Sequence, residues 1–301
     1  MTSMQTAYVP RGPIREHVSM AALTAWGVGG LARRVFEPED RDDLVGFIRA
    51  HREEPLLFVG LGSNLLVRDG GFVGTVVLMT KGFKGMAVDG DSVVLDAGTP
   101  CPKAARFCAA NGLAGLEFFA GIPGTVGGAL AMNAGAYGSE TWDRVHSVDV
   151  LGRDGVIATR APGAFGVSYR TVTGTEDLWF LSARFDLEFG NSDELQTSIR
   201  ELLRKRVEEQ PTGQRSCGSV FRNPMGDYAG RLIEHCGLKG TRVGHAAVSA
   251  KHANFIINDG GASAGDIESL IALVTDQVEA KTGVRLVPEV RIVGTARESS
   301  S

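Results

Sequence analysis

Residues 121–138 read GIPGTVGGALAMNAGAYG, and this glycine-rich stretch decides the interpretation of the chain. A second such stretch, GLGSN at residues 60–64, follows a short apolar run. Glycines permit positive φ angles, so successive backbone N–H groups can point at one anion. Ser63 and Thr125 add hydroxyl donors, and Asn64 adds an amide. Both stretches are therefore candidate diphosphate-binding loops, although tight turns in a strand-rich domain would explain either one alone.

The two stretches match neither of the common nucleotide-binding motifs. Neither contains the GKS or GKT sequence of a P-loop. Neither shows a clear GxGxxG between a strand and a helix, so a Rossmann domain is poorly supported.

Length and composition are those of a multidomain globular protein. The 301 residues suffice for two or three domains, and 43% of them are hydrophobic. The net charge of −4 shows no basic excess, so neither nucleic acid nor a membrane surface is a predicted partner. No apolar run has the length of a signal peptide or a membrane span, which predicts a cytoplasmic location. The cysteines form no CxxC pair or zinc-binding cluster, which predicts reduced thiols and no metal site: Cys101, Cys108, Cys217 and Cys236.

The spacing of apolar residues predicts an α+β protein. Strands are expected at residues 31–36, 56–59, 65–67, 73–79, 93–97, 145–151, 156–158, 178–187, 284–287 and 289–293. Helices are expected from Pro38, from Pro102 to Gly112, from Asp193 to just before Pro211, over residues 228–236, and from Ser263 to Gly283. Residues 1–16 and 296–301 are expected to be frayed ends. Domains are expected at residues 1–85, 86–192 and 193–301, and residues 286–294 could complete the second of them.

Six motifs extend the interpretation over most of the chain. They are GLGSNLLV at residues 60–67, GIPGTVGGALAMNAGAYG at 121–138, GSVFRNP at 218–224, AGRLIEHCGLKG at 229–240, KHANFIIN at 251–258 and PEVRIV at 288–293. Together, and in this order, they closely resemble the UDP-N-acetylenolpyruvoylglucosamine reductase (MurB) family. The resemblance implies a vanillyl-alcohol-oxidase-like (PCMH-type) FAD-binding domain of two α+β subdomains, followed by a C-terminal α+β substrate-binding domain.

The resemblance also implies a reaction. Non-covalently bound FAD, reduced by NADPH, would pass a hydride from flavin N5 to UDP-N-acetylglucosamine enolpyruvate. The product would be UDP-N-acetylmuramate, a precursor of peptidoglycan. The residues that match the family's cofactor contacts are Gly60, Gly62, Ser63, Asn64, Gly121, Ile122, Gly127, Gly128 and Asn133.

Three residues match the family's catalytic positions. Ser219 matches the proton donor; its hydroxyl is a weak acid, but an enolate is a strong enough base to take its proton. Glu289 matches a catalytic glutamate. Arg170 matches an arginine that could bind the substrate carboxylate bidentately. Without the resemblance, these residues would be interpreted as a turn serine, a solvent-facing strand glutamate and a surface arginine. Predicted substrate contacts are Asn223, Arg222, Lys251 and Tyr169.

The sequence departs from the family pattern in two ways. Val172 stands where a serine is common, and Thr171 or Thr173 could supply the missing hydroxyl. The chain is also short for the family, so it is expected to lack the insertion that carries a tyrosine over the substrate. His245 and His252 lie in apolar sequence, and we interpret them as packed or hydrogen-bonded residues rather than catalytic ones.

Three other functions stay open from the sequence. A paralogue on the same fold would reduce a different enolpyruvyl nucleotide. An FAD-dependent oxidase would use molecular oxygen, since the FAD-binding domain is shared. A non-catalytic nucleotide-binding protein would need only the glycine loops and no catalytic residues. The oligomeric state cannot be inferred from the sequence.

Overall fold

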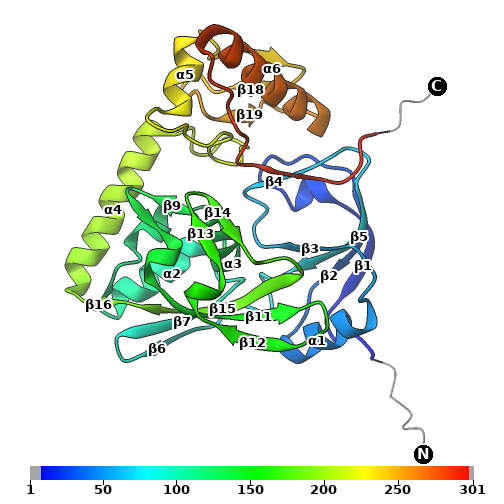
Figure 1. Cartoon of the computed structure of the whole chain (residues 1–301), viewed down its shortest axis with the longest axis vertical. Coiled ribbons are helices and arrows are strands. Elements are labelled where there is room, and N and C mark those ends of the chain that lie inside the picture. The colour runs from blue at the N-terminus through cyan, green and yellow to red at the C-terminus, as the bar shows by residue number, and fades with distance from the viewer. Residues whose placement is uncertain (1–7, 298–301) are drawn as a thin grey trace, which may run out of the picture. The chain divides into compact units, whose positions relative to one another are not determined.

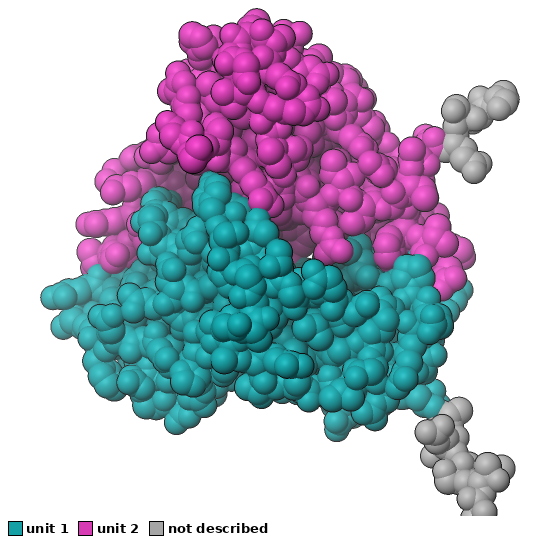
Figure 2. Space-filling model, in the orientation of Figure 1, with its two compact units in different colours: residues 1–16, 34–60, 74–196 teal, residues 17–33, 61–73, 197–301 magenta. Residues whose placement is uncertain are grey.

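The computed structural model describes residues 8–297, which divide into two compact units (Figure 2). Of the described residues, the first unit contains 8–16, 34–60 and 74–196. The second unit contains residues 17–33, 61–73 and 197–297. Each unit is therefore assembled from separate stretches of chain. The division into three domains at residues 85 and 192 stays a prediction.

The first unit is built mainly on an antiparallel sheet in the order β12-β11-β15-β7-β6 (Figure 1). These strands are β6 (Met86–Asp89), β7 (Ser92–Asp96), β11 (Val145–Gly152), β12 (Ile157–Arg160) and β15 (Leu178–Asp186). Two helices follow β7 in the chain, α2 (Cys101–Ala110) and α3 (Val126–Met132), and α3 packs against β7 and β15. Short pairs complete the unit: β8 (Leu113–Ala114) with β16 (Glu188–Phe189), β9 (Gly135–Ala136) with β10 (Ser139–Glu140), and β13 (Gly166–Ser168) with β14 (Thr171–Thr173).

A second sheet has the order β1-β2-β5-β3, with β3 parallel to β5. Its strands are β1 (Ile14–Ser19), β2 (Leu31–Phe36), β3 (Leu56–Val59) and β5 (Phe72–Leu78). Helix α1 (Arg41–Ala50) buries Leu44, Phe47 and Ile48 in the core of the first unit. The ring of Phe47 stacks on that of Phe36, with 4.3 Å between centroids. The apolar side chains of this helix therefore form its buried face.

The second unit packs α5 (Ala229–His235) and α6 (Ala264–Thr282) with a three-stranded sheet (Figure 1). The strands of this sheet are β17 (Arg242–Val243), β18 (Ala246–Val248) and β19 (Ile256–Asn258). Helix α6 begins with a capping box at the predicted Ser263, because Ser263 accepts from the N–H of Asp266 and Asp266 accepts from the N–H of Ser263. Helix α4 (Ser192–Glu209) leads into this unit from residues of the first.

Two early stretches of the chain complete the second unit. Strand β4 (Leu65–Val67) pairs in parallel with β20 (Arg291–Val293). Trp26 is fully buried in the same core as α5 and α6, and its indole N–H donates to the carbonyl of Ile256 at 2.8 Å. The carboxylate of Asp69 accepts from the first two N–H groups of α6.

Several predicted elements differ from the structure at their ends or in kind. Helix α1 begins at Arg41 rather than at Pro38, because Asp40 is the N-cap and accepts from the N–H of Asp43 at 2.9 Å. Residues 126–132, expected to be loop, form α3. Residues 284–290 form no strand; Pro288 makes only an isolated bridge with Phe221. Proline has no N–H to extend a ladder, which explains this interruption.

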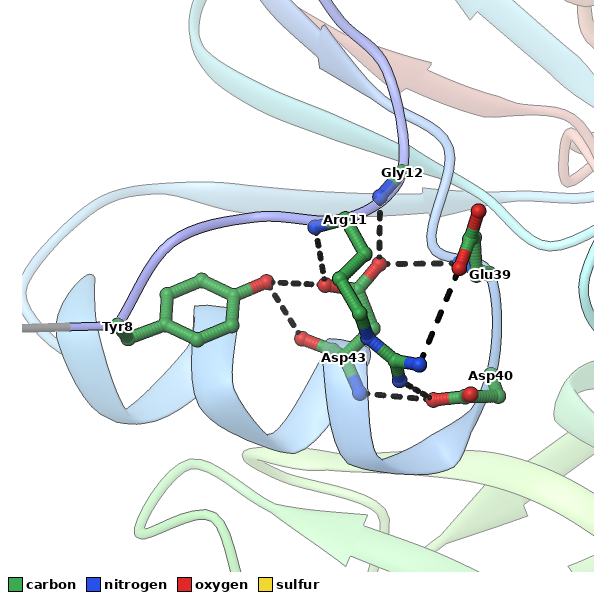
Figure 3. Close-up of polar contacts among 6 residues, drawn as sticks. All are labelled: Tyr8, Arg11, Gly12, Glu39, Asp40 and Asp43. Carbon is green, nitrogen blue, oxygen red and sulfur yellow. Dashed lines mark hydrogen bonds and ion pairs between the residues drawn. The ribbon is translucent and has the colours of Figure 1, made fainter.

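The expectation of a frayed N-terminal end is wrong for residues 8–16. The buried carboxylate of Asp43 accepts four hydrogen bonds, from the hydroxyl of Tyr8 and from the N–H groups of Arg11, Gly12 and Glu39 (Figure 3). Their lengths lie between 2.6 and 3.0 Å. The rest of the predicted end, residues 1–7, lies outside the described residues, as do residues 298–301.

Replacing Asp43 with alanine is expected to lower the free energy of unfolding by about 3 kcal/mol at pH 7. The substitution leaves several buried or half-buried N–H groups without an acceptor, and each such group costs about 1–3 kcal/mol. Urea unfolding measures the change. The matched control is Asp42→Asn on the exposed side of the same turn. Equal, small changes in both variants would contradict this role.

The contribution of Asp43 should also depend on pH. Burial alone would raise the pKa of Asp43, but the hydrogen bonds from Arg11, Tyr8, Glu39 and Gly12 outweigh burial and lower it. A carboxylate with a lowered pKa stabilises the folded state above its ordinary value of 3.8, and loses that effect as the pH falls through the lowered value. The difference between wild type and Asp43→Ala should therefore shrink in acid.

Candidate active site

Ser219 lies on a segment that is held from both sides within the second unit. The N–H of Val220 donates to the carbonyl of Asn254 at 2.9 Å, and the carbonyl of Val220 accepts from the N–H of Glu289 at 2.7 Å. The N–H of Arg222 donates to the carbonyl of Val287 at 2.9 Å. The segment therefore behaves like a strand between two neighbours. Ser219 itself is exposed.

Glu289 belongs to the same hydrogen-bonded group. The side-chain amide of Asn64 donates to the carbonyl of Glu289 at 3.1 Å, and the carbonyl of Asn64 accepts from the N–H of Arg291. Burial raises the pKa of the Cys217 thiol well above its ordinary value, and the negative charge of Glu289 raises it further. The backbone of Glu289 thus joins the segment that carries Ser219 to Asn64. Three predicted residues, Asn64, Ser219 and Glu289, are thus brought together.

A cavity of about 420 Å³ opens beside this segment in the second unit. It contains three predicted residues, Ser219, Asn223 and Lys251, but not Arg222. Two cationic side chains, Lys251 and Arg231, line it together with one carboxylate, that of Glu234, and Arg231 is ion-paired with Asp227. Such a cavity suits an anionic ligand. Its described lining residues are Ser219, Asn223, Tyr228, Gly230, Arg231, Glu234, Lys251, His252, Ala253 and Asn254.

Secondary structure positions two of the predicted substrate contacts. The side-chain oxygen of Asn223 accepts from the N–H of Ala229 at 3.1 Å, at the start of α5. The ammonium group of Lys251 donates to the carbonyl of Val207 at 2.5 Å, in the last turn of α4. A cation near a helix C-terminus also interacts favourably with the helix dipole. Both side chains are therefore held at helix ends beside the cavity.

The first glycine loop keeps free backbone donors. Gly62 has a φ of 62°, and a Cβ there would lie 2.0 Å from the carbonyl oxygen of Leu23, so only glycine fits. The N–H groups of Leu61, Gly62 and Ser63 donate to no atom among residues 8–297. Consecutive free N–H groups beside a left-handed glycine form a cradle for an anion. The loop therefore fits the diphosphate of FAD.

In the second glycine stretch, close packing rather than a positive φ angle explains the glycine at residue 127. Thr125 caps α3, and the N–H of Gly127 donates to the carbonyl of Ala97 at 2.8 Å. A Cβ on Gly127 would lie 2.8 Å from that of Ala97, and a Cβ on Gly60 would lie 2.3 Å from the hydroxyl of Thr125. These glycines have negative φ, so they are required by close packing. Gly128 is less crowded, with its N–H 3.4 Å from the Thr125 hydroxyl.

Two predicted cofactor residues lie just before α3. Gly121 ends a short 3₁₀ helix, and a Cβ there would lie 2.8 Å from the ring of Tyr137. The N–H of Ile122 donates to the carbonyl of Phe119 at 3.0 Å. These residues, like Gly127, are fixed by internal contacts.

Asn133 and Arg170 meet at the C-terminal end of α3. Asn133 has a φ of 46°, is buried, and donates from its side chain to Glu140 at 2.7 Å. The guanidinium of Arg170 donates to the carbonyls of Asn133 and Gly135, at 3.3 and 2.7 Å. It also lies over the ring of Tyr169, 5.3 Å from the centroid. The carbonyls that end α3 therefore orient Arg170.

Tyr169 and Arg170 form the two-residue turn between β13 and β14. Ser168 pairs with Thr171 across this turn, and Arg170 has a φ of 54°. Val172, which replaces the usual serine, pairs with Val167 on the hairpin. The hydroxyl of Thr173 donates to the carbonyl of Gly166 at the far end of the hairpin.

Sequence reasoning missed five polar side chains of the cavity. His252 was interpreted as packed or hydrogen-bonded, and its Nδ1 does accept from the N–H of Asn254 at 3.2 Å. Burial lowers the pKa of His252, which keeps the ring neutral at pH 7. The only sequence signal is that all five lie within or next to the motifs at residues 229–240 and 251–258. The five residues are Tyr228, Arg231, Glu234, His252 and Asn254.

Comparisons with known proteins identify the family to which the chain is similar. Residues 32–160 match the FAD binding domain family, and residues 210–293 match the C-terminal domain of UDP-N-acetylenolpyruvoylglucosamine reductase. The reductase of Alkalilimnicola ehrlichii is 53% identical over 287 residues, which cover 95% of this chain and 96% of the relative. That of Methylococcus capsulatus is 52% identical and covers 98% of each chain.

The chain belongs to the UDP-N-acetylenolpyruvoylglucosamine reductase family. The crystal structure of the family member from Thermus caldophilus matches with a TM-score of 0.81 at 34% identity. That match covers 94% of this chain and 99% of the other. The predicted family and the predicted α+β fold with an FAD-binding domain are confirmed. Among the described residues, no helix is long and apolar enough to cross a membrane.

Proposed function

We propose that this chain uses FAD and NADPH to reduce UDP-N-acetylglucosamine enolpyruvate to UDP-N-acetylmuramate. This reaction supplies a precursor of peptidoglycan. Membership of the reductase family supports the reaction. The structural observation that carries the proposal is the cavity of the second unit, where Ser219 lies with Asn223 and Lys251.

Reduction of an enol ether makes three demands. A hydride must reach the β-carbon, the charge that develops on the α-carbon and its carboxylate must be stabilised, and a proton must reach the α-carbon. Bound FAD, once reduced by NADPH, supplies the hydride. The protein must supply the cations and the proton donor.

Ser219 is the proposed proton donor. Its hydroxyl lines the cavity on a segment whose backbone is fixed on both sides, so its position is set before the substrate binds. Such preorganisation favours proton transfer, because a general acid must lie within hydrogen-bond reach of the reacting atom. We assign Glu289, which hydrogen-bonds to this segment, a supporting catalytic role.

The cations of the two units have distinct proposed roles. Lys251 and Arg231 line the cavity and suit the diphosphate of the UDP moiety, with Asn223 as an amide donor. Arg222 is half-buried outside the cavity lining, so we assign it a secondary role in substrate binding. In the first unit, Arg170 is held by the carbonyls that end α3, and we assign it, with Tyr169, to the substrate carboxylate.

FAD would be held without a covalent bond. The free N–H groups beside Gly62 and Ser63 suit its diphosphate, and Asn64 ties this loop to Glu289. The remaining proposed cofactor residues are held by the contacts around α3: Gly60, Gly121, Ile122, Gly127, Gly128 and Asn133. All four cysteines are buried and free, which suits a cytoplasmic, reducing location.

An anaerobic experiment tests the function. The FAD-loaded protein is reduced with NADPH, UDP-N-acetylglucosamine enolpyruvate is added, and the oxidised flavin band is followed. We expect rapid reoxidation with formation of the lactyl ether. A flavin that stays reduced would favour the paralogue. In a separate run without the enolpyruvyl substrate, rapid reoxidation on admission of oxygen would favour an oxidase. Failure to bind FAD would contradict the proposal altogether.

A further inference from the structure

Asn254 uses both ends of its side-chain amide to hold the segment that carries Ser219. Its Oδ1 accepts from the N–H of Phe221 at 2.9 Å, and its Nδ2 donates to the carbonyl of Phe221 at 2.8 Å. If the amide were flipped, its NH2 group would face the N–H of Phe221 and its oxygen would face the carbonyl of Phe221. The two hydrogen bonds therefore fix the orientation of the amide. Asn254 is 4% exposed, and water therefore cannot readily replace these bonds.

The backbone of Asn254 is bound as well. Its carbonyl accepts from the N–H of Val220, and its N–H donates to Nδ1 of His252 at 3.2 Å. One residue therefore bonds to both positions that follow Ser219. Gly218, on the other side of Ser219, has a φ of 81°, which sets the direction from which the chain enters.

The turn that contains Asn254 is itself rigid. The hydroxyl of Ser249 accepts from the N–H groups of Lys251 and His252. The N–H of Ser249 donates to the carbonyl of Phe255 at 2.8 Å, and the N–H of Phe255 donates to the carbonyl of His252. The same turn thus places Lys251 beside the cavity and Asn254 against the Ser219 segment.

We propose that Asn254 is a positioning residue, which fixes the hydroxyl of Ser219 at the place where it donates its proton. The inference rests on the proposed function, because it assumes that Ser219 is the proton donor. An asparagine is suited to this role because its amide offers the same donor and acceptor as a peptide group. Aspartate would keep the acceptor for the N–H of Phe221 but place a negative oxygen against the carbonyl of Phe221.

The test is Asn254→Asp, with the two half-reactions of the FAD-loaded protein measured separately by stopped flow. We expect reoxidation by the enolpyruvyl substrate to slow by about 10- to 100-fold, since small misplacements of reacting groups have effects of this size. Flavin reduction by NADPH and FAD retention should change less than about twofold, because Asn254 acts through Ser219 alone.

A double-mutant cycle separates positioning from a general structural effect. In the Ser219→Ala background, Asn254→Asp should slow reoxidation no further, because the group that it positions is gone. Equal losses in both backgrounds, or an equal slowing of flavin reduction, would overturn the inference. Lack of any effect in the wild-type background would overturn it too.

The chain offers a matched control in Asn258→Asp. Asn258 is also buried and also donates its side-chain N–H to a backbone carbonyl, that of Trp26 at 2.8 Å. Its side-chain oxygen accepts from the N–H groups of residues 260–262, so its side chain makes no bond to residues 219–222; its backbone N–H donates to the carbonyl of Arg215 at 2.9 Å, a bond that the substitution keeps. Reoxidation by the folded Asn258→Asp protein should stay within about twofold of wild type, whatever its loss of stability.

Two further measurements keep the inference testable. If Asn254→Asp does not fold, Asn254→Ser removes the amide donor without adding charge, and the same slowing is expected. Amide hydrogen exchange at Val220 and Phe221 should be faster in either variant, and unchanged exchange would contradict the role of Asn254 in holding this segment. A wild-type protein that never reoxidises with the substrate would contradict the proposed function, whereas equal losses in the cycle would contradict only the role of Asn254.

Discussion

Ser219→Ala is expected to lower turnover by about 10²- to 10⁴-fold, the range typical for loss of a general acid. The substitution removes one exposed oxygen from the cavity and leaves the backbone bonds of Val220 to Asn254 and Glu289 intact. FAD should therefore stay bound, and flavin reduction by NADPH should proceed as in wild type. The loss should appear only when the enolpyruvyl substrate is added.

The measurement is the rate of reoxidation, with product identified by mass spectrometry. Ser216→Ala is the matched control, because Ser216 lies on the same segment but is not among the described residues that line the cavity. It should reoxidise at the wild-type rate. A Ser219→Ala protein that forms the lactyl ether at an unchanged rate would show that the proton comes from another group.

Arg170→Lys is expected to lower turnover by about 10²- to 10³-fold, comparable to removal of one donor to a developing anion. The guanidinium donates two N–H groups to the carbonyls of Asn133 and Gly135, which fix the orientation of its plane. A lysine ammonium cannot match that planar fork. A φ of 54° is equally unfavourable for arginine and for lysine, so the substitution tests only the charged group at the end of the side chain.

Steady-state kinetics with the enolpyruvyl substrate should place this loss mainly in kcat. Arg160→Lys provides the control, because Arg160 is an exposed arginine on β12 of the same unit. That variant should behave as wild type. A change confined to KM in Arg170→Lys would mean that Arg170 binds the substrate without stabilising the charge that develops during the reaction.

Local signals in the sequence predicted some elements closely. Helix α6 was predicted from Ser263 to Gly283, because a capping box and a left-handed glycine mark its ends. Strand β2 was predicted with its correct bounds from its apolar pattern and the glycines before it. Such signals depend only on neighbouring residues, and a single sequence contains them in full.

Helix α3 escaped prediction because its stability is not local. Its sequence contains two glycines, which disfavour helix by about 1 kcal/mol each. The structure offsets this cost with the Thr125 cap and with the close contact between Gly127 and Ala97, the residue that follows β7. The requirement for glycine at residue 127 comes from Ala97, about thirty residues earlier, so no local rule could find it.

The candidate site was predictable only in part for the same reason. Ser219, Asn223 and Lys251 could be found because they match family motifs, and the structure brings them to one cavity. The backbone bonds that position Ser219 come from Asn254 and Glu289, which lie far along the chain. The hydrogen bonds of Asp43 to residues 8–12 likewise carry no periodic pattern, so that segment was expected to fray.

The pairing of Trp26 with Ile256 has a consequence for synthesis of the protein on the ribosome. These residues are 230 positions apart, and translation at about 5–20 residues per second separates their emergence by roughly 10 to 50 seconds. During that delay Trp26 and strand β4 have been synthesised, but the C-terminal residues that bury the indole and pair with the strand have not. A fragment expressed from residue 197 onward would contain α5 and α6 yet lack the indole that is buried in the same core.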